Sequence, residues 1–239
     1  MPGEAASDAG ERVVIPRKRT LGFAFVVVIG LVVFGGARQS FGASMPGQVI
    51  TVQATSPHSV VAVVRTWVLE SDGKYRQMNG PFVADVGVHG VGHTKEGLGR
   101  TPIGVFALTQ AFGNQANNGT RLPYLRAGLD DWWDENPTSG QYNEHVRSRF
   151  SPGAPSENLY EAGAAYAHAV VINYNTDPVV KGAGSGFFLH VAMGAPTEGC
   201  VAIPAADLNW VMRWLDPALD PIISIGVGRA ARAVVTTSQ

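Results

Sequence analysis

The residues best suited to chemistry gather around Cys200, which is the only cysteine in this 239-residue chain. It ends the run Thr197-Glu198-Gly199-Cys200, and His190 stands ten residues earlier, near the end of an apolar run. A thiol becomes a strong nucleophile when a base takes its proton. A glycine before it lets the backbone approach a substrate closely, so the amide N–H of Cys200 can point at a developing oxyanion. An inert buried cysteine beside a structural histidine fits the same spacing, so the residues alone leave both interpretations open.

The elements that must position these residues are mostly strands. Six short runs rich in valine, isoleucine and aromatic residues are predicted as strands, at 60–69, 82–88, 103–109, 167–174, 187–192 and 222–227. Asp72-Gly73 predicts a hairpin turn after the first of them. One amphipathic helix is predicted between Pro204 and Pro217, from the helical spacing of Leu208, Val211, Met212 and Leu215. We therefore expect a mainly β domain with one amphipathic helix after the cysteine segment.

The N-terminal region has the pattern of an export signal. Residues 20–37 carry no charge, and as a helix they would span roughly 27 Å, enough to cross the hydrocarbon core of a bilayer. Arg17, Lys18 and Arg19 precede this run and only Arg38 follows it, which places the rest of the chain outside the cell. A signal anchor and a cleaved signal peptide fit equally well. The expected organisation is a cytoplasmic tail (1–19), a single membrane or signal segment (20–37), a linker (38–57), a catalytic domain (58–228) and a tail (229–239).

Composition excludes some classes of protein. Hydrophobic residues make up 45% of the chain, enough for a packed core. The 18 basic residues are balanced by 19 acidic ones, which argues against a general nucleic-acid binder, because such proteins need a basic surface. An exported protein with one cysteine cannot form an internal disulfide, which draws further attention to Cys200.

Two segments together carry a family resemblance. His190 followed by Thr197-x-Gly199-Cys200 resembles the L,D-transpeptidase catalytic domain, also called the YkuD/ErfK type. The upstream run Gly99-Arg100-Thr101-Pro102-Ile103-Gly104-Val105-Phe106 is similar to the Thr-Pro-x-Gly-x-Phe turn and strand of that family. The resemblance covers roughly residues 60–227 and implies a mixed β-sandwich fold.

The chain departs from the family pattern at three points, as a divergent member would. Glu198 replaces a histidine, Ala202 stands where arginine or asparagine is usual, and the loop from His190 to Cys200 is short. We expect Glu198 to point away from the site, toward solvent or toward Arg100 or Arg121. The alanine at position 202 bears on how a substrate is anchored.

The resemblance implies a two-step acyl transfer on peptidoglycan stem peptides, outside the cytoplasm, in the bacterial cell envelope. Cys200 would attack a tetrapeptide stem with His190 managing the proton, and an amine of another stem would then take the acyl group. Water in place of the amine would make the protein an L,D-carboxypeptidase. Gly199, Tyr174 and Thr197 are the candidate oxyanion or substrate-binding residues. Carbapenem-type β-lactams are the expected inhibitors, and no cofactor, metal or nucleic acid is implied.

Two other functions remain as alternatives. A catalytically silent module that binds the cell wall would keep the fold without the chemistry, as Ala202 hints. A zinc peptidase would use His89 and His93, whose spacing suits a metal only on a helix, and the glycines between them make a helix improbable. The long segment 113–165, which includes residues 130–135, Tyr142 and His145, is interpreted as a wall of a glycan or peptide groove.

Overall fold

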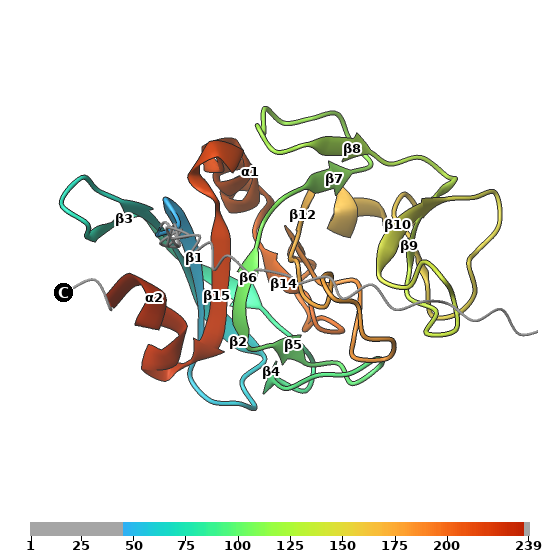
Figure 1. The fold of residues 1–239 in the computed structure, drawn as a ribbon, viewed down its shortest axis with the longest axis horizontal. Coiled ribbons are helices and arrows are strands. Elements are labelled where there is room, and N and C mark those ends of the chain that lie inside the picture. The colour runs from blue at the N-terminus through green and yellow to red at the C-terminus, as the bar shows by residue number, and fades with distance from the viewer. Residues whose placement is uncertain (1–44, 237–239) are drawn as a thin grey trace, which may run out of the picture. The chain divides into compact units, whose positions relative to one another are not determined.

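The computed structural model describes residues 45–236, and the strands dominate this part of the chain (Figure 1). Ten of them form one mixed sheet in the order β6-β15-β1-β2-β3-β14-β13-β12-β7-β8. In chain order these strands are β1 (Gln48–Ala54), β2 (Val61–Leu69), β3 (Tyr75–Asp85), β6 (Gly104–Ala107), β7 (Ala111–Gly113), β8 (Tyr124–Arg126), β12 (Ala169–Val171), β13 (Phe188–Val191), β14 (Val201–Ile203) and β15 (Ile222–Val227). The expectation of a mainly β domain is confirmed.

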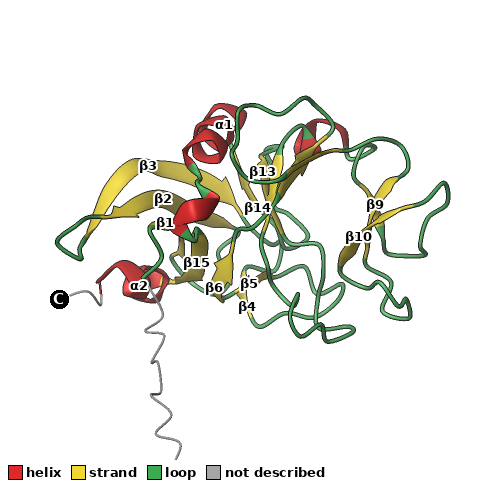
Figure 2. Ribbon diagram, turned by 45° about the horizontal axis from the view of Figure 1, so that its top comes forward, coloured by secondary structure: helices red, strands yellow, loops and turns green. Residues whose placement is uncertain are grey.

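Smaller elements complete the described residues. Two short sheets consist of β4 (Val91–Gly92) with β5 (Thr101–Pro102), and of β9 (Asp131–Asp134) between β10 (Glu144–Arg147) and β11 (Glu157–Asn158). The helices are α1 (Ala205–Trp214), α2 (Ala233–Thr236) and three 3₁₀ turns at Gly163–Tyr166, Pro217–Leu219 and Gly228–Arg232. Figure 2 separates these few helices from the strands by colour.

The ten strands form one continuous mixed sheet, which is consistent with the expected mixed β fold. The two halves of the sheet meet between β3 and β14. These two strands are joined through one residue pair, Ala202 with Asp85. On one side of this seam, β2 and β3 form the predicted hairpin. The amide of Glu70 donates to the carbonyl of Lys74 at 2.8 Å, and Gly73 takes the positive φ of 81° that its turn requires.

Helix α1 is the predicted amphipathic helix, and it follows β14 directly. It begins after Pro204, and its four periodic apolar residues are fully buried: Leu208, Val211, Met212 and Leu215. They join a large core that lies on one face of the sheet and includes Ile50, Leu189 and Val201. Burying a side chain of this size contributes roughly 1.5–3 kcal/mol, so this face supplies much of the stability that holds β13 and β14 in place.

The expected boundaries of the domain need correction at both ends. Residues 48–54, which we expected in the linker, form β1 in the middle of the sheet, paired with β15 and β2. The four consecutive β-branched residues from Val49 to Val52 are a strand pattern that the small and polar residues around them obscured. At the other end, residues 229–236 of the expected tail belong to helical turns, and Ala231 is fully buried there.

The predicted membrane or signal segment, residues 20–37, lies outside the described residues. Within residues 45–236, no helix is long and apolar enough to cross a membrane.

Candidate active site

His190 lies on β13, and Cys200 immediately precedes β14, the strand that pairs with β13 in parallel. The register pairs His190 with Ala202, two residues after Cys200. Side chains alternate along a strand, so His190, Ala202 and Cys200 share one face of the sheet, opposite the face that packs against α1. Both His190 and Cys200 line a common pocket on this face.

The thiol of Cys200 is 9% exposed and is held by backbone groups of β13 and the loop before it. It donates to the carbonyl of Gly186 at 3.3 Å and accepts from the amide of Phe188 at 3.3 Å. Burial raises the pKa of Cys200 well above its ordinary value, and the carboxylates of Glu157 and Glu135 raise it further. At neutral pH the resting residue is therefore a thiol, and something must assist its ionisation.

His190 is buried and oriented by its own strand. Its Nδ1 lies 2.9 Å from the carbonyl oxygen of Val191, so a backbone carbonyl holds the ring. Burial lowers the pKa of His190, although the carbonyls of Val191 and Ala165 oppose this shift. The imidazole is therefore neutral at neutral pH, the state in which a base can accept a proton. Among residues 45–236, no hydrogen bond joins His190 to Cys200 directly.

Tyr166 links the two residues and was missed by the sequence analysis. Its ring meets the imidazole of His190 edge to face, with 5.4 Å between the ring centres. Its hydroxyl donates to Glu157 and acts to lower the pKa of Cys200. Tyr166 ends a 3₁₀ turn that no motif marked, so only the fold reveals its position.

The turn before Cys200 is built from Thr197 and Gly199. The hydroxyl of Thr197 donates to the carbonyl of Cys200 at 2.7 Å and accepts from the amide of Gly199 at 3.1 Å. Gly199 has a φ of 142°, and a Cβ there would lie 2.5 Å from the Phe187 ring. Only glycine fits this close approach.

The upstream motif contributes to the same turn through Thr101. The buried hydroxyl of Thr101 accepts from the amide of Gly87 at 2.8 Å and donates to the carbonyl of Cys200 at 3.2 Å. Two segments about a hundred residues apart therefore fix one peptide group. This contact gives a physical reason for the two motifs to occur together.

Tyr174 lies elsewhere. Its ring packs edge to face against Phe106 and Phe187, and its hydroxyl donates to the carbonyl of Ala183 at 2.9 Å. It lines neither of the two pockets that contain Cys200. The structure thus brings Thr197 and Gly199 to the thiol, but not Tyr174.

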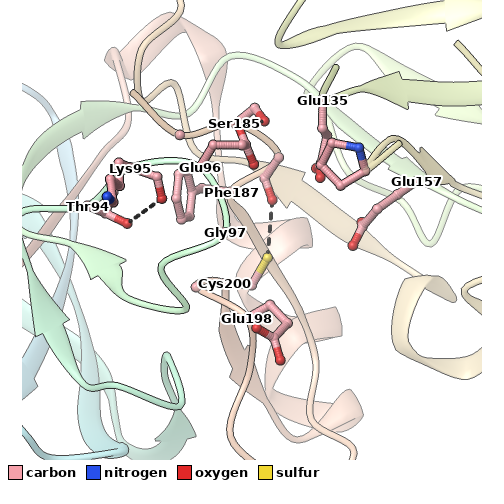
Figure 3. A pocket seen from close by; sticks show the side chains of 14 residues that line it. Thr94, Lys95, Glu96, Gly97, Glu135, Glu157, Ser185, Phe187, Glu198 and Cys200 are labelled. Carbon is pink, nitrogen blue, oxygen red and sulfur yellow. Dashed lines mark hydrogen bonds between the residues drawn. The ribbon is translucent and has the colours of Figure 1, made fainter. Parts of the chain in front are cut away.

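Glu198 is exposed, as expected. It contributes to the lining of both pockets that contain Cys200, and in Figure 3, which draws one of them, its carboxylate points away from the sulfur. Within the described residues no ion pair joins it to an arginine, because Arg121 pairs with Asp216 at 2.7 Å and Arg100 donates to the carbonyl of His89 at 3.0 Å. Of the two expected surroundings, solvent or an arginine, Glu198 therefore has solvent.

A second pocket opens on the other side of Cys200, with a volume of about 290 Å³ (Figure 3). The segment 113–165 contributes Glu135, Pro155 and Glu157 to its wall. Trp133 from the same segment is buried and packs against Phe188, with 5.1 Å between the ring centres. The expected groove wall thus comes from carboxylates, while Trp133 packs inward.

In the zinc alternative, His89 has another contact. Nδ1 of His89 lies 2.9 Å from the carbonyl oxygen of Leu98. Across residues 45–236, no group of three or more histidine, cysteine, aspartate and glutamate residues is arranged to hold a metal ion.

Comparison with known proteins agrees with this geometry. No curated protein matches the sequence. The family model of the YkuD domain, the L,D-transpeptidase catalytic domain, matches residues 53–223, which is more than half of the chain and includes both motifs. The paired strands, the Thr101 contact and this match lead to one conclusion: the chain belongs to the YkuD family of L,D-transpeptidase catalytic domains.

Proposed function

We propose that the protein is a cysteine acyltransferase that cross-links peptidoglycan stem peptides outside the cytoplasm. The Sγ atom of Cys200 attacks the carbonyl carbon of the penultimate residue of a tetrapeptide stem. A thioester bond forms, the amide bond to the terminal D-alanine breaks, and the departing amine receives the thiol proton through His190. An amine of a second stem then displaces Cys200 and restores the thiol.

The observation that carries this proposal is the arrangement of Cys200 and His190 on paired strands. Both side chains face one pocket, and the imidazole is neutral and fixed by the carbonyl of Val191. Because the resting thiol has a raised pKa, proton transfer to His190 must accompany the attack on the carbonyl. The Tyr166 hydroxyl supports this step, since it acts to lower the pKa of Cys200.

Backbone geometry supports stabilisation of the oxyanion. Thr197 and Thr101 fix the carbonyl of Cys200, and Gly199 brings the adjacent backbone close to the pocket. We assign the amide N–H of Cys200 as one oxyanion donor on this basis. Thr197 acts as a positioning residue.

A second candidate function rests on Ala202 and the carboxylates. Ala202 lines the His190 pocket at 1% exposure and offers no charge to anchor a stem, and Glu157 and Glu135 disfavour the thiolate. A domain that binds the wall without chemistry would tolerate both features. Hydrolysis of the thioester, giving an L,D-carboxypeptidase, is a variant of the main proposal in which water reaches the thioester first.

Carbapenem labelling tests the proposal. Wild-type protein incubated with a carbapenem should gain the mass of one inhibitor molecule, because the thiolate opens the β-lactam ring and keeps the whole acyl group. Cys200→Ala should gain nothing. An unlabelled wild-type protein that still sediments with purified peptidoglycan would instead establish the silent binding module. The ratio of cross-linked to hydrolysed stems then separates transpeptidation from carboxypeptidation.

A further inference from the structure

The pocket beside the thiol of Cys200 is unusually acidic. Four glutamates from four separate segments line it: Glu96, Glu135, Glu157 and Glu198. Lys95 is the one basic residue among its lining residues, and its side chain is exposed. Figure 3 shows the labelled glutamates distributed around the thiol on different walls of the pocket.

Two of these carboxylates have partners from the protein. Glu96 accepts hydrogen bonds from the hydroxyls of Tyr142 and Ser185, the latter at 2.7 Å. Glu157 accepts from the hydroxyl of Tyr166. These bonds fix both side chains in the wall of the pocket.

Glu135 differs from them because its carboxylate has no hydrogen-bond donor among residues 45–236, although the residue is only 8% exposed. It lies so close to Gly186 that a Cβ at that position would be 1.7 Å from Oε1. The carbonyl of Gly186 accepts a hydrogen bond from the thiol of Cys200. The carboxylate of Glu135, which lies against Gly186, is therefore close to the reacting group. A buried carboxyl group without a partner stays protonated unless a ligand supplies a donor or a positive charge that favours the carboxylate.

The four carboxylates lie on separate walls of the pocket, and this spacing determines which kind of cation fits. No group of three among the described residues is arranged to hold a metal ion, so the pocket does not suit a small divalent cation. An ammonium group offers three N–H donors that can reach separate acceptors. The volume of about 290 Å³ suits a short alkyl chain that carries this group and reaches Cys200.

We propose that this pocket binds the primary alkylammonium group of a substrate, with Glu135 as its principal acceptor. The proposal rests on the proposed function in one respect: it makes the bound cation part of the molecule on which Cys200 acts. It adds a recognition element that the two motifs do not contain, because the glutamates lie at positions 96, 135, 157 and 198.

Binding should be coupled to proton release. Burial raises the pKa of Glu135 to about 9, and the neighbouring carboxylates Glu157, Glu96 and Asp134 add to this shift. The remaining charged or titratable groups of the pocket are Lys95, Glu198 and Cys200. Glu135 is therefore protonated at pH 7 in the empty pocket. An arriving ammonium group favours the carboxylate, so the proton leaves and affinity rises with pH from 6 to about 9.

The first test measures binding without chemistry, in full-length Cys200→Ala protein. Isothermal titration with pentylammonium chloride is compared with titration by 1-pentanol, which has the same chain and no charge. At pH 7 the ammonium should bind at least about tenfold more tightly. Buffers of different ionisation enthalpy should reveal the release of close to one proton.

Variants in the same background locate the site. Glu135→Gln should weaken pentylammonium binding at least about tenfold and abolish the proton release. The matched control is Glu144→Gln, since Glu144 is exposed at the start of β10, outside the pocket lining. Equal binding of pentylammonium and 1-pentanol, or unchanged binding by a folded Glu135→Gln protein, would overturn the proposal. If Glu135→Gln does not fold, Glu96→Gln provides the second test, with a weakening of several-fold expected.

This result is independent of the carbapenem experiment, so either proposal can fail alone. In active protein, two arms then assign the cation. N-acetylation of the donor stem should raise KM for hydrolysis if the donor carries the ammonium, whereas added pentylammonium should compete with the acceptor and slow transfer without slowing hydrolysis if the acceptor carries it. No change in either arm would overturn the proposal.

Discussion

The two faces of the strands around the site carry opposite kinds of chemistry. On the α1 face, Leu189 and Val201 are fully buried among aliphatic side chains. On the other face, Phe188 and Cys200 lie in a smaller cluster of aromatic residues, beside His190 and the carboxylates. Because successive side chains of a strand point in opposite directions, three- and four-residue strands serve both purposes at once. Substitutions on one face should therefore alter the stability of the domain, and substitutions on the other face should alter its reactivity.

The faces also differ in how they respond to pH. The α1 face is built from aliphatic side chains such as Leu189, Val201 and Leu208, which do not titrate. The Cys200 face buries a thiol, an imidazole and two carboxylates whose pKa values are all shifted by burial. Its stability must therefore change with pH. The following predictions test this contrast, from the largest expected effect to the smallest.

Cys200→Ala should reduce stem-peptide turnover by at least about a thousandfold, because it removes the nucleophile. The thermal unfolding midpoint should change little, since the variant keeps a small apolar residue in the same aromatic cluster. Product analysis and calorimetry on one preparation measure both. Turnover near the wild-type rate would rule out the thioester.

Leu208→Ala tests the opposite face. It should lower the free energy of unfolding by about 2–5 kcal/mol, because Leu208 is fully buried on the inner side of α1. Turnover per folded molecule should stay the same. Arg213→Ala is the control, since Arg213 is exposed on the same helix and should cost less than about 0.5 kcal/mol. A loss of catalytic rate in folded Leu208→Ala protein would argue that the two faces are coupled.

Glu135→Gln should flatten the dependence of stability on pH. The folded-state pKa of Glu135 is raised to about 9, so its contribution to stability is fully present below the unfolded value near 4.5 and is lost as pH rises toward 9. Wild-type protein should lose up to about 1.4 kcal/mol per pH unit relative to the variant between pH 5 and 9. Urea unfolding across this range measures the difference. Parallel profiles would mean that Glu135 ionises normally in the folded state.

Glu157→Gln should make the thiol more reactive. Among the neighbouring carboxylates, Glu157 raises the pKa of Cys200 most. Its removal should therefore leave more thiolate at pH 8–9. Alkylation by iodoacetamide, followed by mass spectrometry of the single cysteine, should accelerate roughly three- to tenfold. The Tyr166 hydroxyl can still donate to the glutamine, which makes the change nearly isosteric. A slower reaction would show that Glu157 assists ionisation.

Local sequence patterns predicted the elements that depend on neighbouring residues. The spacing of Leu208, Val211 and Met212 predicted α1, and Asp72-Gly73 predicted the β2–β3 turn. These succeed because helical periodicity and turn conformation are decided within a few residues. The strand β1 was missed, since its pairing with β15 joins residues more than 160 positions apart.

The candidate site divides in the same way. The sequence by itself determined the single thiol, the histidine on the preceding strand and the glycine that its turn requires. Only the tertiary structure decided that Tyr166 touches His190, that Thr101 holds the carbonyl of Cys200, and that four glutamates converge on one pocket. The physical reason is that a glutamate looks the same in sequence whether it is solvated or buried. Its burial and its pKa depend on which distant segments the fold brings beside it.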